Sequence, residues 1–361
     1  MGDAVSNKML VAGARGIVGR SVIKHFAALP GWEVVGLSRG DPDFDEVIEW
    51  RNVDLRDIES CRSVLKELSD ITHICYSAVF EKPNLTKSWS EADHARINVN
   101  MLRNLLENVS KNSPKIKHIT LMQGTKAYGG HLGPFKMPAR EDDPRSMGPN
   151  FYYDQMDWLI DYQKSKAWTW TIFRPQLVCG VAARSPLNIM AAVGVFAAIS
   201  RESGVPLRFP GGVERVGEAT DARIIAQAIE WAGSNKIADN QIYNVTNGDV
   251  YIWHHVWPKV AELFGMDHGS PQPMSLNRLM PENSEIWTRV VKKYSLRNYS
   301  LGDLVPSWQF ADYIFGYGQR PNPHHMSNIK IRQHGFQECT DTEHMMIDLL
   351  KEMQKLGIIP F

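Results

Sequence analysis

Three glycines near the start of the chain are spaced to bind a phosphate group. They lie between an apolar run at 9–12 and a helical pattern over 17–29. Glycine lets the backbone turn tightly and approach phosphate oxygens, and a helix N-terminus offers free N–H groups and the positive end of its dipole. The spacing is G-x-x-G-x-x-G rather than G-x-G-x-x-G, but a second strand-like run follows at 32–37. The pattern predicts a dinucleotide site made by Gly13, Arg15, Gly16, Ile17, Val18 and Gly19.

Ser38 and Arg39 stand at the end of that second predicted strand. A site that prefers NAD places an acidic residue here for the ribose hydroxyls. A guanidinium and a hydroxyl instead suit a 2′-phosphate, which they bind by charge-assisted hydrogen bonds. Arg15 could add a second positive charge. The sequence therefore predicts NADP(H) as cofactor, and the alternative is that Arg39 is a solvated loop residue.

Three further segments suggest chemistry. A loop with the pattern T-K-x-Y-x-G occupies 125–130 and is followed by Gly133-Pro134-Phe135, N-F-Y-Y occupies 150–153, and 244–250 precedes Trp253 and Trp257. Together they resemble the progesterone 5β-reductase and iridoid synthase group of extended short-chain dehydrogenases/reductases. The resemblance covers nearly the whole chain.

The resemblance implies that Lys126 and Tyr152 are the catalytic residues. Most short-chain reductases place these two types one helical turn apart, as Y-x-x-x-K, but here Met156 and Asp157 occupy the lysine positions. In this group the lysine comes instead from the loop after the fifth strand, and the tyrosine is the first of the pair. A nearby ammonium is expected to stabilise the ionised form of a tyrosine wherever in the chain it originates. Tyr153 is the competing tyrosine, and a solvated loop lysine is the alternative for Lys126.

Other candidate residues stand at the ends of predicted strands, where open α/β sheets bind their ligands. Asp54 and Leu55 fall where an adenine would lie, and 77–79 where the nicotinamide-side phosphate and ribose would lie. The segment 173–178 is expected to contact the nicotinamide ring, although Arg174 could be an anchor between lobes. Each position could also serve capping or packing. The remaining candidate cofactor contacts are Asp54, Leu55, Ser77, Ala78, Val79, Gln123, Lys126, Tyr152, Pro175 and Val178.

The elements that must position these residues alternate between strand-like and helical patterns. Strands are expected at 9–12, 32–37, 48–55, 72–78 and 116–122. Helices are expected at 17–29, at 92–109 and at 150–166, and a further helix follows the third strand and ends at about 68. This alternation predicts an α/β fold with a Rossmann-type doubly wound parallel sheet. We expect an NADP-binding core over 1–180. Residues 181–361 are expected to form a smaller, mostly helical C-terminal substrate lobe, with segments at about 212–250 returning to the core.

Composition limits the partners. The chain has 361 residues, 43% of them hydrophobic, and its 40 basic residues balance 40 acidic ones, which argues against nucleic acid and anionic membranes. No apolar stretch reaches membrane-spanning length, and no secretory pattern opens the sequence. Four scattered cysteines suit a reducing compartment, so we expect a cytoplasmic protein, and a homodimer is left open.

The second half is rich in aromatic residues. They suit either a pocket for a hydrophobic carbonyl compound or simple packing. The doublets 254–255 and 324–325 are both His-His, but no Cys or carboxylate spacing completes a site, so no metal is expected. The aromatic residues concerned are Trp287, Trp308, Phe310, Tyr313, Phe315 and Tyr317.

Three functions fit these residues. The resemblance implies an NADPH-dependent reductase in which hydride reaches the β-carbon of an enone or enal and Tyr152 stabilises the enolate. The same residues would serve a carbonyl reductase or alcohol dehydrogenase, with Tyr152 as proton donor. A non-catalytic NADP-binding regulator would need neither Lys126 nor Tyr152. Sugar-nucleotide epimerisation is disfavoured because the Y-x-x-x-K geometry is missing.

Overall fold

The computed structural model describes residues 7–82, 88–318 and 324–361, and the chain forms two compact units. The first unit contains residues up to Gln176, together with Ala222–Val245 and Met326–Glu338. The second contains Leu177–Asp221, Thr246–His325 and Cys339–Phe361. The chain therefore passes between the units several times rather than dividing at a single point.

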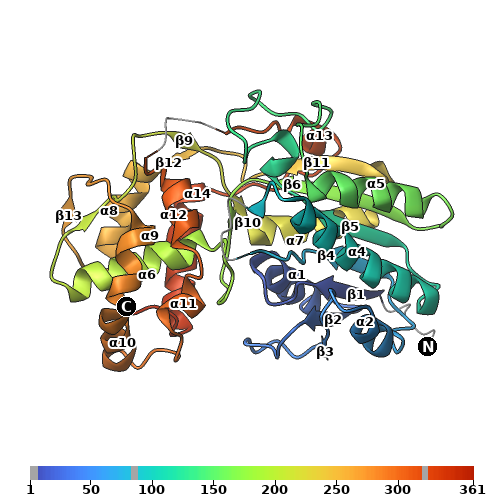
Figure 1. Ribbon diagram of the computed structural model, residues 1–361, viewed down its shortest axis with the longest axis horizontal. Coiled ribbons are helices and arrows are strands. Elements are labelled where there is room, and N and C mark those ends of the chain that lie inside the picture. Colours follow the sequence, from blue (N-terminus) through green and yellow to red (C-terminus); the bar gives the residue numbers. More distant parts are fainter. Residues whose placement is uncertain (1–6, 83–87, 319–323) are drawn as a thin grey trace. The chain divides into compact units, whose positions relative to one another are not determined.

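The first unit is built on a seven-stranded parallel sheet with the order β11-β6-β5-β4-β1-β2-β3 (Figure 1). Successive strands run outward from β1 in one direction and from β4 in the other, so the order reverses between these two neighbours. Ligands of such sheets bind beside this reversal, at the carboxyl ends of the strands. The strands are β1 (Asn7–Ala12), β2 (Trp32–Ser38), β3 (Glu49–Asn52), β4 (His73–Tyr76), β5 (His118–Met122), β6 (Thr169–Pro175) and β11 (Gln241–Val245).

Helices flank this sheet. Right-handed crossovers that leave β1 and β4 in opposite directions place their helices on opposite faces. Accordingly α1 packs with α7, while α4 packs with both α2 and α5 (Figure 1). The Rossmann-type parallel fold expected from the sequence is confirmed. The helices of this unit are α1 (Ile17–Ala27), α2 (Ile58–Leu65), α4 (Ala92–Asn112), η1 (Thr125–Tyr128), α5 (Phe151–Gln163), α7 (Ala222–Ser234), η2 (Lys236–Ala238) and α13 (Ile329–Gln333).

Most element boundaries differ from the expected ones by a few residues. The third strand differs most: the apolar pattern predicts a strand over 48–55, but β3 covers only Glu49–Asn52. It ends at Asn52 because the chain turns after Asp54, whose carbonyl accepts a hydrogen bond from the N–H of Asp57, the residue that caps α2. Val53 and Leu55 are nevertheless buried, whereas Ile48 and Trp50 are only partly buried, so the apolar pattern overestimated the strand.

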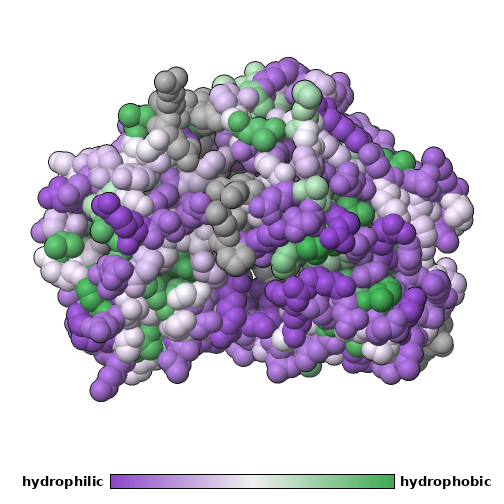
Figure 2. Space-filling view, in the orientation of Figure 1, coloured by the Kyte–Doolittle hydropathy of each residue, from purple (hydrophilic) through white to green (hydrophobic). Residues whose placement is uncertain are grey.

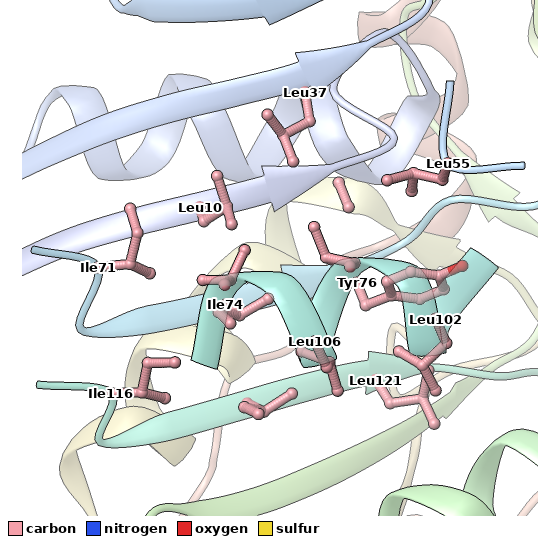
Figure 3. Packing of buried hydrophobic residues seen from close by; sticks show 14 of the residues in the cluster. Leu10, Leu37, Leu55, Ile71, Ile74, Tyr76, Leu102, Leu106, Ile116 and Leu121 are labelled. Carbon is pink, nitrogen blue, oxygen red and sulfur yellow. The ribbon is translucent and has the colours of Figure 1, made fainter. Parts of the chain in front are cut away.

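Apolar side chains from the sheet and α4 form the core of the first unit. Figure 3 shows Leu10 and Leu37 on neighbouring strands, with Leu102 and Leu106 of α4 directed toward the sheet. These four side chains are at most 1% exposed. Burial of a leucine contributes about 1.5–3 kcal/mol. The strand ends, and the site residues on them, therefore rest on a packed base.

The second unit is mostly helical, and its described residues form three short two-stranded sheets. Its helix α6 is buried along nearly its whole length. Phe315 packs edge-on against Phe209, Trp253 and Trp257, and Trp287 is 1% exposed, so these aromatic side chains form a core. The helices are α6 (Ile189–Glu202), α8 (Trp253–Leu263), α9 (Leu276–Leu279), η3 (Met280–Asn283), α10 (Ser284–Lys293), α11 (Leu301–Leu304), α12 (Trp308–Phe315) and α14 (Thr342–Lys355). The strands are β7 (Val178–Cys179), β8 (Leu207–Arg208), β9 (Val216–Gly217), β10 (Thr220–Asp221), β12 (Tyr251–Ile252) and β13 (His268–Gly269).

Among the described helices, none combines the length and the hydropathy needed to cross a membrane. On the face drawn in Figure 2, hydrophilic side chains predominate and apolar ones appear as small separate spots. The apolar residues are instead concentrated in the two cores.

Candidate active site

The glycine loop after β1 has a shape that only glycine allows. Gly13 has a φ of +87°, and a Cβ there would lie 2.8 Å from the backbone nitrogen of Ala78. A Cβ on Gly19 would lie 2.2 Å from the Gly13 carbonyl oxygen. The loop therefore packs against both the residues after β4 and the first turn of α1. This is the close packing of strand, turn and helix that a pyrophosphate cradle requires.

Helix α1 begins at this loop with its first N–H groups uncapped by a side chain. Its N-cap is Gly16, and its first turn contains no acidic residue. The first N–H groups of any helix lack intrahelical partners. Those of Ile17, Val18 and Gly19 therefore suit an anion, and these residues fit the dinucleotide that the sequence predicts.

The residues expected to bind the ribose 2′-phosphate are Arg15 in the loop and Ser38 and Arg39 at the end of β2. Arg39 is exposed, and Ser38 ends β2. The Arg15 guanidinium lies against Gly40, where a Cβ would be 2.5 Å from Nη1. An acidic residue that the sequence argument did not consider is also present, because Asp43 Oδ2 lies 3.8 Å from Arg15 Nη2. Asp43 is also paired with Arg20, and the charge of Arg39 acts on the carboxyl group of Asp54.

The strand ends bring some of the other candidates to the loop. Ser77 and Ala78 lie against Gly13, and Ser77 Oγ donates to the carbonyl of Ala12, while Val79 is 40% exposed. Asp54 forms a bidentate pair with Arg56, whose hydrogen bond lowers the pKa of the carboxyl group, and the side chain of Leu55 is in the core. The contact of Asp54 and Leu55 with an adenine stays a prediction.

Lys126 is buried among aromatic rings in the turn η1. Its Nζ lies 4.6 Å from the ring centre of Trp89, 4.7 Å from that of Phe151 and 5.3 Å from that of Tyr152. Burial lowers the pKa of its ammonium to about 8, although the charge of Glu81 opposes this shift. Lys126 is therefore not a solvated loop lysine.

Tyr152 lies in the first turn of α5 and is 9% exposed. Its Oη is beside Gly124, where a Cβ would be 3.4 Å away. Burial, and secondarily the charge of Glu81, raises the pKa of Tyr152 above its usual value. Desolvation disfavours the phenolate, so the hydroxyl of Tyr152 keeps its proton at neutral pH in this structure. That Lys126 tunes the ionisation of Tyr152 stays a prediction.

Tyr153 has a different environment. Its hydroxyl donates to the carbonyl of Ala127 at 2.8 Å and accepts from the N–H of Ser146 at 2.8 Å. The hydroxyl thus joins α5 to two loops. For Tyr152 the structure gives no hydrogen bond to Oη within the described part of the chain. Of the two tyrosines, Tyr152 has the hydroxyl free to act on a ligand.

Asn150 connects the two proposed catalytic residues. Its Oδ1 accepts from the N–H of Tyr152 at 3.1 Å as the cap of α5, and its Nδ2 donates to the carbonyl of Lys126 at 2.7 Å. Such a bridge fixes the start of α5 to the lysine turn. Sequence rules could have found the cap, since asparagine is favoured immediately before a helix.

Gln123 and Arg174 hold the same region from β5 and β6. Gln123 Nε2 donates to the carbonyl of Tyr152 at 2.8 Å, and its Oε1 accepts from Arg174 Nε at 3.0 Å. Arg174 also donates to Tyr128 Oη, at 3.2 Å. All of these partners belong to the first unit, and the contacts of Gln123 and of 173–178 with a cofactor stay predictions.

Pro175 and Val178 complete the predicted cofactor contacts. The carbonyl oxygen of Pro175 lies at the same Gly124 position as Tyr152 Oη, 3.5 Å from a Cβ built there. Val178 belongs to the second unit, where it pairs with Thr220. Its contact with a nicotinamide stays a prediction.

Comparison with known proteins identifies the family. The model of the PRISE-like Rossmann-fold domain matches residues 57–360. The chain belongs to this PRISE-like family. It is 32% identical over 371 residues to (S)-8-oxocitronellyl enol synthase ISY1 of Nepeta cataria, covering 97% of this chain and 92% of the relative. It is also 32% identical over 373 residues to the 3-oxo-Delta(4,5)-steroid 5-beta-reductase of Arabidopsis thaliana, with the same coverage.

Solved structures give the fold of this PRISE-like chain independently. The UDP-glucose 4-epimerase of Thermotoga maritima matches with a TM-score of 0.68 at 17% identity, covering 96% of this chain and 99% of that one. The UDP-glucose 4-epimerase of Thermus thermophilus, solved with NAD, matches with a TM-score of 0.64 at 18% identity, covering 95% and 99%. The resemblance stated from the sequence is confirmed: the chain is a member of the PRISE-like family, and its fold is that of extended short-chain dehydrogenases/reductases.

Proposed function

We propose that this chain is an NADPH-dependent reductase of hydrophobic α,β-unsaturated carbonyl compounds that reduces the C=C bond conjugated to the carbonyl. The observation that carries the proposal is the buried, protonated hydroxyl of Tyr152 beside Gly124, at the carboxyl edge of the sheet, with Lys126 supplied by the turn after β5. Two relatives named for an enol synthase and for a steroid 5-beta-reductase support the choice of reaction.

NADPH, when bound, supplies the hydride of such a reaction. The cradle of Gly13, Gly16 and Gly19 would hold its pyrophosphate, with the first N–H groups of α1 directed at the phosphate oxygens. Arg39 and Arg15 would bind the 2′-phosphate, and this choice of NADPH over NADH rests on their positive charge.

Tyr152 would donate a hydrogen bond to the carbonyl oxygen of the substrate. Negative charge develops on that oxygen as an enolate forms, and a preorganised donor in a desolvated site stabilises it. Burial raises the pKa of Tyr152, which favours the protonated hydroxyl needed for this donor. Lys126 would contact the nicotinamide ribose and maintain positive charge beside the ring of Tyr152.

The cellular compartment and the oligomeric state are also proposals. The four cysteines are unpaired, which supports a reducing compartment and hence the cytoplasm. Fractionation of cells that express the tagged protein tests the compartment. Light scattering of the purified chain tests the homodimer that the sequence leaves open.

A product analysis tests the reaction. Purified protein and NADPH would be incubated with cyclic enones, linear enals and the corresponding saturated ketones and aldehydes, and the products identified by mass and NMR. Saturated carbonyl products are expected. Allylic or saturated alcohols would establish carbonyl reduction instead, and tight NADPH binding without any turnover would establish a regulator.

A further inference from the structure

A buried carboxylate lies beside the proposed catalytic lysine. The side chain of Glu81, in the loop after β4, is 8% exposed, and its Oε1 is 3.8 Å from Lys126 Nζ. The lysine side chain is 13% exposed. This is a largely desolvated ion pair, in which the loss of either partner leaves a buried charge.

Two ring nitrogens lie close to the other oxygen of this carboxylate. Trp89 Nε1 donates a hydrogen bond to Glu81 Oε2 at 3.1 Å, and His94 Nε2 is 3.2 Å from the same oxygen. His94 is fully buried on α4. Among the described residues, Oε1 has no hydrogen-bond partner, so the oxygen that faces the lysine is left for charge pairing.

The other groups around Lys126 supply no negative charge at neutral pH. Trp89 and Phe151 are uncharged, and Tyr152 keeps its proton because burial raises its pKa. His131 also faces the lysine, and burial together with the lysine charge lowers its pKa to about 4, so it is neutral. In the described part of the chain, Glu81 is the carboxylate within 4.0 Å of Nζ.

We propose that Glu81 is a positioning residue of the reaction, whose carboxylate keeps the Lys126 ammonium charged and fixed among the aromatic rings while Trp89 and His94 hold the carboxylate. The role in turnover rests on the proposed function; the ion pair itself does not. Burial brings the pKa of Lys126 down to about 8, and the Glu81 charge acts in the opposite direction. Without that charge a substantial part of the lysine would be neutral at physiological pH.

The test measures the titration of Lys126 directly in the full chain without cofactor. Protein labelled with ¹³Cε-lysine would be titrated by NMR, with the Lys126 signal assigned by its absence in Lys126→Met. In Glu81→Gln, which keeps the size and a carbonyl oxygen for Trp89, the Lys126 midpoint should fall by about one pH unit or more. An unchanged midpoint would overturn the proposal.

Glu91→Gln is the matched control, because Glu91 is a nearby carboxylate that pairs with Lys82 rather than with Lys126. Its Lys126 midpoint should equal that of the wild type. If Glu81→Gln does not fold, Glu81→Asp serves instead, since it withdraws the carboxylate by one methylene. Its midpoint should lie below the wild-type value, and an equal value would overturn the proposal.

Kinetics then separate this proposal from the proposed function. In Glu81→Gln the alkaline limb of the kcat/KM profile for enone reduction should move to lower pH by the shift seen by NMR. A shifted NMR midpoint in a protein that reduces no enone would defeat the proposed function and leave the ion pair intact. Enone reduction whose alkaline limb does not move would defeat the positioning role alone.

Discussion

At the scale of single residues, the two adjacent tyrosines in the first turn of α5 have different roles: one is proposed to be catalytic and the other is structural. The hydroxyl of Tyr153 forms hydrogen bonds with the backbones of Ala127 and Ser146, and these bonds connect the helix to two loops. Tyr152 points its hydroxyl at Gly124, where the absence of a side chain leaves room for a ligand. The two positions are therefore expected to respond differently to the same substitution.

Tyr152→Phe should reduce kcat for the enone substrate by about 10²–10³-fold, because it removes the donor to the developing enolate. The Kd for NADPH, measured by calorimetry, should stay within about twofold of wild type. Tyr153→Phe is the matched control: it should retain most turnover and lose about 1 kcal/mol of stability through its lost hydrogen bonds. A larger loss of kcat in Tyr153→Phe would reverse the assignment.

Arg39→Ala should weaken NADPH binding selectively. The exposed guanidinium is expected to form a charge-assisted bond with the 2′-phosphate, so NADPH should lose about 1.5–3 kcal/mol while NADH is almost unaffected. Calorimetry with both cofactors at matched ionic strength measures the difference. If the wild-type chain binds NADH as tightly as NADPH, the cofactor assignment is wrong.

At the scale of elements, two asparagines cap helices in the same way at different places. Asn150 caps α5 and donates to the carbonyl of Lys126 at 2.7 Å, and Asn188 caps α6 and donates to the carbonyl of Ala182 at 2.7 Å. Both are nearly buried. Only the first joins an element that carries Tyr152 to the turn that carries Lys126.

Asn150→Ala and Asn188→Ala should each cost about 1–2 kcal/mol of stability, since each removes an N-cap and a second hydrogen bond. Thermal or urea unfolding measures this loss. Asn150→Ala should also reduce kcat at least about tenfold, because both proposed catalytic side chains lose their common anchor. An equal reduction in Asn188→Ala would show that the effect comes from stability alone.

Elements also explain how far sequence reasoning reached. Apolar periodicity located five strands of the parallel sheet, β1 to β5, and the helices α1, α2, α4 and α5 that pack on it, and the glycine spacing located the loop. Sequence reasoning did not predict which neighbouring groups a buried polar side chain bonds to. Gln123 was expected at the cofactor and 173–178 at the nicotinamide, but spacing did not reveal that Gln123 and Arg174 bond to one another and that Gln123 also bonds to the backbone of Tyr152.

The proposed site contains a partner that no sequence pattern indicates. Glu81 follows β4 and Lys126 follows β5, so only the pairing of these two strands brings their loops together. The raised pKa of Tyr152 likewise comes from burial, which no sequence pattern shows. Burial of an individual side chain depends on the whole unit and cannot be derived from local spacing.

At the scale of the whole molecule, the cysteines are distributed over both units. Cys61 and Cys75 are buried in the first unit, and burial raises the pKa of each thiol to about 12. Cys179 is buried in the second unit, where burial also raises the pKa of its thiol. Cys339 is exposed. Thiolate is the reactive form, so one thiol per native chain should react quickly with a thiol reagent at pH 8, and mass spectrometry should locate it at Cys339.

The three slow thiols should then report the opening of each unit separately. Because the proposed NADPH cradle lies in the first unit, bound NADPH should stabilise that unit by about 2.7 kcal/mol at a concentration 100 times Kd, and slow the labelling of Cys61 and Cys75 about 100-fold. Labelling of Cys179 should slow much less if the second unit opens on its own. Labelling rates with and without NADPH, followed peptide by peptide, measure both effects. Equal protection of all three thiols would contradict this prediction and show that the two units open as one, and protection confined to Cys179 would move the cofactor site out of the first unit.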